Sequence, residues 1–251
     1  MSSARYRMLD EIRGFALLNM IIYHALWDMV YLFNFRLDWY HSNYSYIWQQ
    51  GICWTFIFVS GFCYHFGKNK VKRGILLLLI SVAISLITLI ATPESAVKFG
   101  VLTLIGSATL ITLFSEKHLK KINPIIGFIS TTILFAITRN VNIGELGFES
   151  FHITNLPNSL YKNLFTVYIG FPESTFYSTD YFSIFPWIFL FLSGYFANTT
   201  LKNKNLLNIF KTARIRSLEI LGLYSLPIYV LHQPVIYGVL LVLSKLLPIH
   251  N

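Results

Sequence analysis

The chain has 251 residues, of which 55% are apolar and only 12% are charged, with a net charge of +9. A soluble domain carries about 25% charged residues, and a disordered chain combines high charge with few apolar residues, so the composition excludes both classes. Because one bilayer span takes about 20 apolar residues, the length predicts a polytopic membrane protein with about six to eight spans.

Seven apolar runs follow one another along the chain, and each is predicted to be a membrane-spanning helix. They cover residues 14–33, 46–66, 74–91, 99–114, 122–138, 181–197 and 220–243. The first run follows Arg5 and Arg7, as in a signal peptide, but it is too long and lacks a small-residue cleavage site, so we expect a retained span. Residues 157–172 are aromatic and punctuated by glycine and proline, which favours a re-entrant or interfacial segment.

The basic residues outside these runs predict how the helices are oriented. With the N-terminus inside and seven alternating spans, fifteen Lys and Arg residues fall inside and five outside, as the positive-inside rule requires. We therefore predict an all-α integral membrane fold, a single bundle over residues 1–251, with its N-terminus cytoplasmic and its C-terminus outside. The expected location is the cell membrane, as a multi-pass protein surrounded by lipid.

Neither nucleic acid nor metal is expected as a partner. The chain has no dense basic arm with interleaved aromatic residues of the kind that binds nucleic acid. Cys53 and Cys63 are ten residues apart in one predicted helix. That spacing separates them by about 15 Å, too far for a disulfide. No Cys/His spacing is typical of zinc.

Three titratable side chains fall inside predicted spans, where each needs a partner or a cavity. His24 and Asp28 are four residues apart and share one helix face, and a carboxylate beside an imidazole orients the ring and raises its basicity. His232 stands between Pro227 and Pro234, and each proline permits a kink. These residues either close helix contacts as structural polar groups or line a reaction cavity toward the outer leaflet.

Several motifs occur in order along almost the whole chain. They are RMLDEIRGFA (7–16), MIIYH (20–24), FVSG (58–61), FGVLTLIG (99–106), DYFSIFPW (180–187) and YSLPIYVLHQP (224–234). As an ordered set they resemble the heparan-α-glucosaminide N-acetyltransferase catalytic-domain family. Thr103 departs from many bacterial relatives, which carry histidine at this position.

The resemblance implies an enzyme that transfers acetyl from cytoplasmic acetyl-CoA to the amine of an amino sugar or glycan at the outer face. By position, His41 in the first outer loop corresponds to the catalytic histidine proposed for the family. On chemistry alone, a histidine in such an aromatic loop is more often merely interfacial. His24 and Asp28 complete the expected catalytic set. A histidine suits general-base catalysis near neutral pH, or it takes the acetyl group first and then passes it on.

Further residues are assigned to binding the two substrates. The phosphates of coenzyme A call for basic residues at the cytoplasmic mouth, and the residues expected there are Arg13, Arg73, Arg216 and Asp10. The residues expected at the acceptor are Asp180, Trp187, His232 and Asn43. Family analogy also implies a homodimer.

Three other functions use the same polar residues. O-acylation of a surface polysaccharide places a hydroxyl acceptor in the same cavity. A transporter uses the His/Asp pair as a proton relay, although an odd span number without an inverted repeat argues against it. A haem-binding electron carrier uses His24 and His232 as axial ligands.

Overall fold

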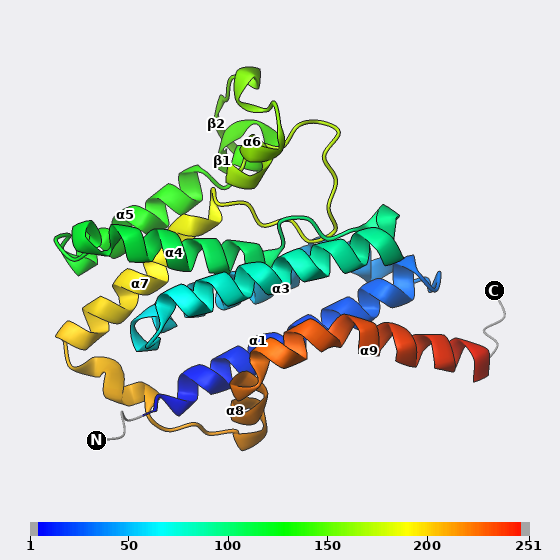
Figure 1. Cartoon of the computed structure of the whole chain (residues 1–251), viewed down its shortest axis with the longest axis horizontal. Helices are drawn as coiled ribbons and strands as arrows, with labels where there is room; N and C mark the ends of the chain where they lie inside the picture. Colours follow the sequence, from blue (N-terminus) through cyan, green and yellow to red (C-terminus); the bar gives the residue numbers. More distant parts are fainter. Residues whose placement is uncertain (1–4, 247–251) are drawn as a thin grey trace. The chain divides into compact units, whose positions relative to one another are not determined.

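The computed structural model describes residues 5–246, and helices make up 72% of the protein against 4% in strands (Figure 1). The mostly helical fold expected from the sequence is therefore confirmed. By their contacts, the described residues form two compact units. Unit 1 comprises the described residues up to Phe56 and those from Leu207 onward, and unit 2 is Ile57–Leu206.

Unit 1 is built on a long first helix that packs against two helices from the other end of the chain (Figure 1). Its elements are α1 (Arg7–Tyr31), η1 (Asp38–His41), the first part of α2 (Asn43–Phe62), most of η6 (Leu206–Phe210), α8 (Arg216–Leu223) and α9 (Ser225–Leu246). Leu17 and Met20 of α1 form a buried cluster with Ile52 of α2.

The contact between α1 and α8 is made backbone to backbone at two glycines. A Cβ atom on Gly14 would lie 1.8 Å from the carbonyl oxygen of Leu218, and one on Gly222 would lie 1.7 Å from that of Asp10. Only glycine permits so close an approach. These two positions therefore bring the N-terminal turns of α1 against α8.

Unit 2 contains two helix pairs and a small subdomain formed by residues 139–186. Its elements are the end of α2, η2 (Cys63–Phe66), α3 (Lys70–Ala91), η3 (Pro93–Ser95), α4 (Val101–Leu119), α5 (Pro124–Ile137), η4 (Val141–Ile143), β1 (Glu145–Phe148), β2 (Phe151–Asn155), η5 (Asn158–Leu160), α6 (Leu164–Ile169) and α7 (Trp187–Asn203). Helix α3 packs on α4, and α5 packs on α7.

Strands β1 and β2 form an antiparallel hairpin that the sequence analysis did not foresee. Glu145 pairs with Asn155 and Phe148 with Phe151, with an irregularity after Leu146. The short helix α6 follows, and its N-terminus is closed by a capping box between Asn163 and Thr166. Residues 157–172 thus hold η5 and α6, and their re-entrant placement stays a prediction.

The predicted spans correspond to observed helices except at the last one. The sequence predicted one helix over residues 220–243, and this is wrong, because the chain turns at Tyr224 and separates α8 from α9. Pro227 lies in the first turn of α9, where a proline is tolerated, and it follows the end of α8 at Leu223 by four residues. Helix α9 continues through Pro234.

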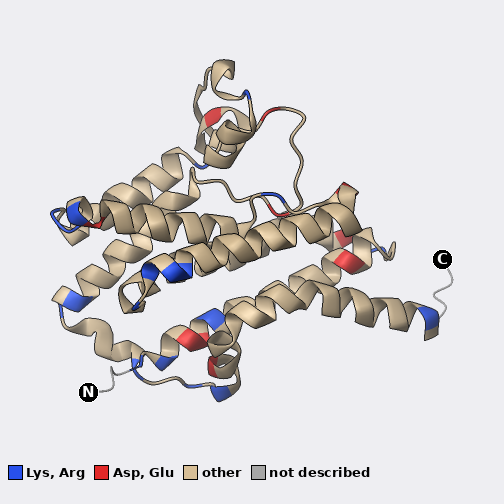
Figure 2. Ribbon diagram, viewed as in Figure 1, with Lys and Arg blue, Asp and Glu red and all other residues tan. Residues whose placement is uncertain are grey.

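Three helical segments of the described chain are long and apolar enough to cross a membrane, namely Lys70–Ala91, Pro124–Ile143 and Ser225–Leu246. Their large apolar side chains are largely uncovered, as shown by Leu79 and Ile126, which are 63% and 62% exposed. Charged residues gather mainly near helix ends and in loops (Figure 2). These helices thus have the surface of segments that face lipid.

Candidate functional site

Two imidazole rings meet between the first and last helices of unit 1. The ring of His24 on α1 and that of His232 on α9 have centroids 4.9 Å apart at an interplanar angle of 60°. The packing of α1 on α9 brings them together, although more than two hundred residues separate them in the chain. Both side chains are half-buried. The two histidines singled out from different spans therefore form one site.

A hydrogen bond to the backbone fixes the tautomer of His232. Its Nδ1 atom bonds the carbonyl oxygen of Tyr229, one turn earlier in α9, at 2.5 Å. Because a carbonyl oxygen only accepts, Nδ1 carries the hydrogen of this bond, and in the neutral ring Nε2 then carries the lone pair. That Nε2 atom is buried and has no hydrogen-bond partner among the described residues. The ring thus offers an unused basic nitrogen next to His24.

Asp28 lies beside this pair, and its side chain is hydrogen-bonded to α9. The side chain is fully buried, and its Oδ1 atom accepts a hydrogen bond of 2.6 Å from Nε2 of Gln233. Its Oδ2 atom has no partner among the described groups. The hydrogen bond that the structure gives Asp28 thus comes from Gln233 of α9, and the pairing of Asp28 with His24 stays a prediction.

Gln233 was missed by the sequence analysis. It joins α9 to α1 through Asp28, and its own Oε1 atom is buried and without a partner in the described structure. The signal that could have revealed it is its place next to His232, ahead of a proline. A polar side chain inside a predicted span needs a hydrogen-bond partner, as an intramembrane histidine does.

His41 lies at the end of η1, exposed, with its ring 5.9 Å from that of Tyr31 and 6.2 Å from that of Tyr40. Tyr40 is only 5% exposed, and burial raises the pKa of its phenol. The Tyr40 ring packs on Tyr23, which in turn meets His24 edge to face at 6.3 Å. A continuous series of aromatic rings therefore joins His41 to the imidazole pair.

Asn43 is the first residue of α2 and is exposed two positions after His41. The structure thus brings four of the sequence-predicted residues, His24, Asp28, His232 and His41, into one region of unit 1, with Asn43 next to the last of them.

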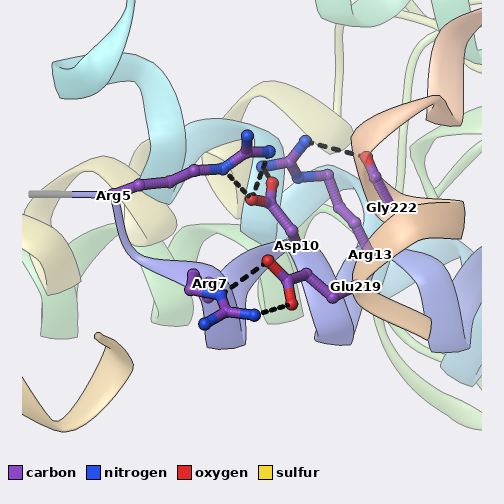
Figure 3. A network of polar contacts seen from close by, with 6 residues as sticks. All are labelled: Arg5, Arg7, Asp10, Arg13, Glu219 and Gly222. Atoms are coloured by element: carbon purple, nitrogen blue, oxygen red, sulfur yellow. Dashed lines mark hydrogen bonds and ion pairs between the residues drawn. The ribbon is translucent and has the colours of Figure 1, made fainter. Parts of the chain in front are cut away.

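At the other end of α1, two of the four expected cofactor-binding residues, Asp10 and Arg13, belong to an ion network (Figure 3). Asp10 is 5% exposed and accepts hydrogen bonds from Nη2 of Arg13 at 2.7 Å and from Nε of Arg5 at 2.8 Å. Arg13 also donates to the carbonyl oxygen of Gly222 at 3.3 Å. Arg13 thereby clamps α1 to α8, and Asp10 holds it in place.

Two more contacts complete this network. Arg7 donates two hydrogen bonds of 2.7 Å to the carboxylate of Glu219 (Figure 3), and this bidentate pairing lowers the pKa of Glu219. Glu11 accepts from the backbone N–H groups of Arg214 and Ile215 just before α8. Arg216 begins α8 and is exposed.

The remaining predicted residues belong to unit 2. Arg73 is exposed in the first turn of α3. The Oδ2 atom of Asp180 accepts from the backbone N–H of Val101 at 3.3 Å, so this carboxylate lies at the N-terminus of α4. Trp187 is 4% exposed and its ring lies 5.0 Å from the guanidinium of Arg139. Asp180 and Trp187 thus have structural contacts of their own.

Among the described residues, no group of three or more His, Cys, Asp or Glu side chains could hold a metal ion. The site in unit 1 lies between apolar helices and contains three polar groups. They are the imidazole Nε2 atom of His232, the buried carboxylate of Asp28 and the amide of Gln233. Fold and site together define a helical membrane protein with a histidine-based polar site.

The family follows from comparison with known proteins. The profile described as "Heparan-alpha-glucosaminide N-acetyltransferase, catalytic" matches residues 5–234, and the chain belongs to this family. The resemblance seen in the sequence motifs is therefore confirmed. The family indicates a membrane acetyltransferase acting on amino sugars. No curated protein and no solved structure matches the chain.

Proposed function

We propose that this protein is a transmembrane acetyltransferase that moves acetyl from cytoplasmic acetyl-CoA to the amine of an amino sugar at the outer face. The observation that carries the proposal beyond the family match is the His24–His232 pair with its unshared Nε2 atom. The lone pair of this nitrogen, which the hydrogen bond from Nδ1 to the Tyr229 carbonyl leaves available, is placed to accept a proton from an amine.

The chemistry requires a base because an amino sugar is mostly an ammonium ion at neutral pH. Nε2 of His232 accepts a proton from the ammonium group, and the neutral amine nitrogen then attacks the thioester carbon. The carbon–sulfur bond breaks, and coenzyme A leaves as a thiolate that takes up the second proton lost by the attacking nitrogen. In a two-step route, a ring nitrogen of His41 first attacks the thioester and expels the thiolate, and the amine then takes the acetyl group and frees the imidazole.

The neighbouring groups have supporting roles in this proposal. Asp28, held by Gln233, supplies negative charge near the imidazole pair as it becomes positive. His24 packs directly on His232 and restricts its ring. Asn43, next to His41, is proposed to contact the acceptor sugar, and the same role stays a prediction for Asp180 and Trp187.

The donor is proposed to bind at the cytoplasmic end of α1. Exposed Arg216 is suited to contact the phosphates of coenzyme A, and the same role stays a prediction for Arg73. Arg13 and Asp10 act there mainly by holding α1 and α8 together, since both are engaged in the buried network. The proposal includes seven spans in one domain, with the N-terminus inside, as the loop charges predict.

The test is acetyl transfer by the purified full chain in liposomes, with labelled acetyl-CoA and glucosamine. His232→Ala is expected to lower the transfer rate about 10²–10⁴-fold, as for loss of a general base. His41→Ala distinguishes the two routes as proposed, because it abolishes transfer if the His41 ring carries acetyl and leaves transfer largely intact if His232 acts alone as the base. His118→Ala is the matched control, since His118 is exposed at the end of α4.

Full activity of His232→Ala would overturn the assigned base. Absence of transfer to any amine by the wild-type chain, with transfer to a polysaccharide hydroxyl, would replace the proposal by O-acylation.

A further inference from the structure

A groove on the surface of α3 begins at the basic end of that helix. Its lining residues are Asn69, Val71, Lys72, Ile75, Leu76 and Leu79. Positions 72, 75, 76 and 79 follow the i, i+3, i+4, i+7 spacing, so they share one side of the helix. The groove therefore runs along a single face of α3, with Asn69 and Lys72 at one end and apolar side chains beyond them.

The apolar part of the groove belongs to a helix that is able to cross a membrane. Lys70–Ala91 has the length and hydropathy of a span, and Ile75, Leu76 and Leu79 are 46%, 45% and 63% exposed. The seven residues from Lys72 to Leu79 extend about 10 Å along the helix axis. These side chains thus offer an apolar surface to an acyl chain in the half of the bilayer where α3 begins.

The polar end of the groove carries two hydrogen-bond donors. Lys72 is exposed, and its ammonium takes part in none of the ion pairs between residues 5–246. Asn69 caps α3 with its Oδ1 atom, which accepts from the backbone N–H of Lys72 at 3.0 Å, so its Nδ2 group is left to donate elsewhere. Because Lys72 is the third residue of the span, both donors lie near the headgroup layer, where they match a phosphate group.

The charge at this end of α3 favours an anionic partner. Lys70, Lys72 and Arg73 all fall in the first turn, which contains no acidic residue (Figure 2). Cations are unfavourable at the N-terminus of a helix, because the backbone dipole is positive there. Lys70 is compensated by Glu116 of α4 at 3.2 Å, whereas the described chain gives Lys72 no such carboxylate. The positive-inside rule accounts for basic residues at this end, but not for a lysine that lines the groove.

A second groove of the described structure differs in this one feature. It lies on α9, and the residues that line it are all uncharged, namely Pro234, Val235, Gly238, Val239, Val242 and Leu243. This groove offers contacts to an acyl chain but no group that distinguishes a charged headgroup from a zwitterionic one. The two grooves therefore provide a matched comparison of lipid selectivity.

We propose that the groove on α3 is a binding site for an anionic phospholipid. The phosphate contacts Lys72 and Asn69, and one acyl chain lies along Ile75, Leu76 and Leu79. A lipid such as phosphatidylglycerol carries a negative charge that its own headgroup does not balance, so the ammonium of Lys72 attracts it more than zwitterionic phosphatidylcholine. In the predicted topology this end of α3 is cytoplasmic. The site belongs to unit 2 and does not depend on the proposed reaction.

The test is quenching of an added tryptophan by brominated lipids in vesicles of equal parts phosphatidylglycerol and phosphatidylcholine, with each lipid brominated in turn. Bromine on an acyl chain quenches a tryptophan that it touches, so Leu79→Trp reports which lipid occupies the groove once the fluorescence of the unmodified full chain is subtracted. Phosphatidylglycerol is expected to be preferred about fivefold, as for one lysine at a membrane surface. Val239→Trp, in the uncharged groove on α9, should show equal quenching by both lipids.

Lys72→Gln, added to Leu79→Trp, should remove this preference. Lys121→Gln is the matched control, since it removes an exposed lysine that does not line the groove. Leu76→Trp supplies a second probe in the same groove, at another exposed side chain. Equal quenching by both lipids in the α3 groove overturns the proposal, as does a preference that survives Lys72→Gln. An equal loss in Lys121→Gln would replace the site by a diffuse basic field, and relief of quenching by acetyl-CoA would assign the groove to the donor instead of a lipid.

Discussion

The two buried aspartates of α1 lie at opposite ends of one helix and have opposite surroundings. Asp10 meets the guanidinium groups of Arg5 and Arg13, so its charge is balanced within the protein. Among residues 5–246, Asp28 is hydrogen-bonded to the neutral amide of Gln233, and its Oδ2 atom has no hydrogen-bond partner. The balanced end serves as a joint between α1 and α8. The unbalanced C-terminal end of α1, with Asp28, lies beside the imidazoles of His24 and His232. A carboxylate without a basic partner is typical of sites where a protein binds or transfers protons.

The largest effect is expected from breaking the balanced end. Asp10→Ala leaves the guanidinium of Arg13 partly buried without its carboxylate, and loss of one partner of such a pair costs about 3 kcal/mol of unfolding free energy. The measurement is thermal or denaturant unfolding of the full chain in detergent. Glu94→Ala removes an exposed carboxylate and serves as control. Equal stability of the two variants would show that the network contributes nothing.

A smaller effect, and one on activity alone, is expected at the unbalanced end. Asp28→Asn keeps an acceptor for Gln233 but removes the negative charge near the imidazole pair, so the transfer rate should fall about tenfold while the melting temperature changes little. The measurement compares kcat with that of Asp38→Asn, which changes an exposed carboxylate of η1. A wild-type kcat would make Asp28 purely structural.

The smallest effect concerns the exposed pair Arg7–Glu219. Because pairing lowers the pKa of Glu219 in the folded state, its contribution to stability is present above the pKa of the unfolded chain and is lost as the pH falls through the folded-state value. Glu219→Gln should therefore flatten the acid side of the stability curve. Melting temperatures of both proteins between pH 7 and about pH 3 test this, and identical slopes would contradict it.

Much of the local structure could be predicted, because it depends on neighbouring residues. The apolar run 74–91 predicted a helix, and α3 covers Lys70–Ala91. The hairpin β1–β2 was missed, since two strands of four and five residues leave little periodicity. The aromatic and β-branched residues Phe148, Phe151 and Ile153 were the signal that could have indicated it.

The amino-acid sequence alone determined that this is a helical membrane protein of an acetyltransferase family, and that His24, Asp28 and His232 needed partners. These features could be recognised without the structure, because hydropathy, periodicity and motifs each depend on residues that are close together in the sequence. The tertiary structure alone decided which partners they have: His232 for His24 and Gln233 for Asp28. It also decided that the chain turns at Tyr224. Such choices depend on the packing of α1 with α8 and α9, which segments distant in the chain make only after folding.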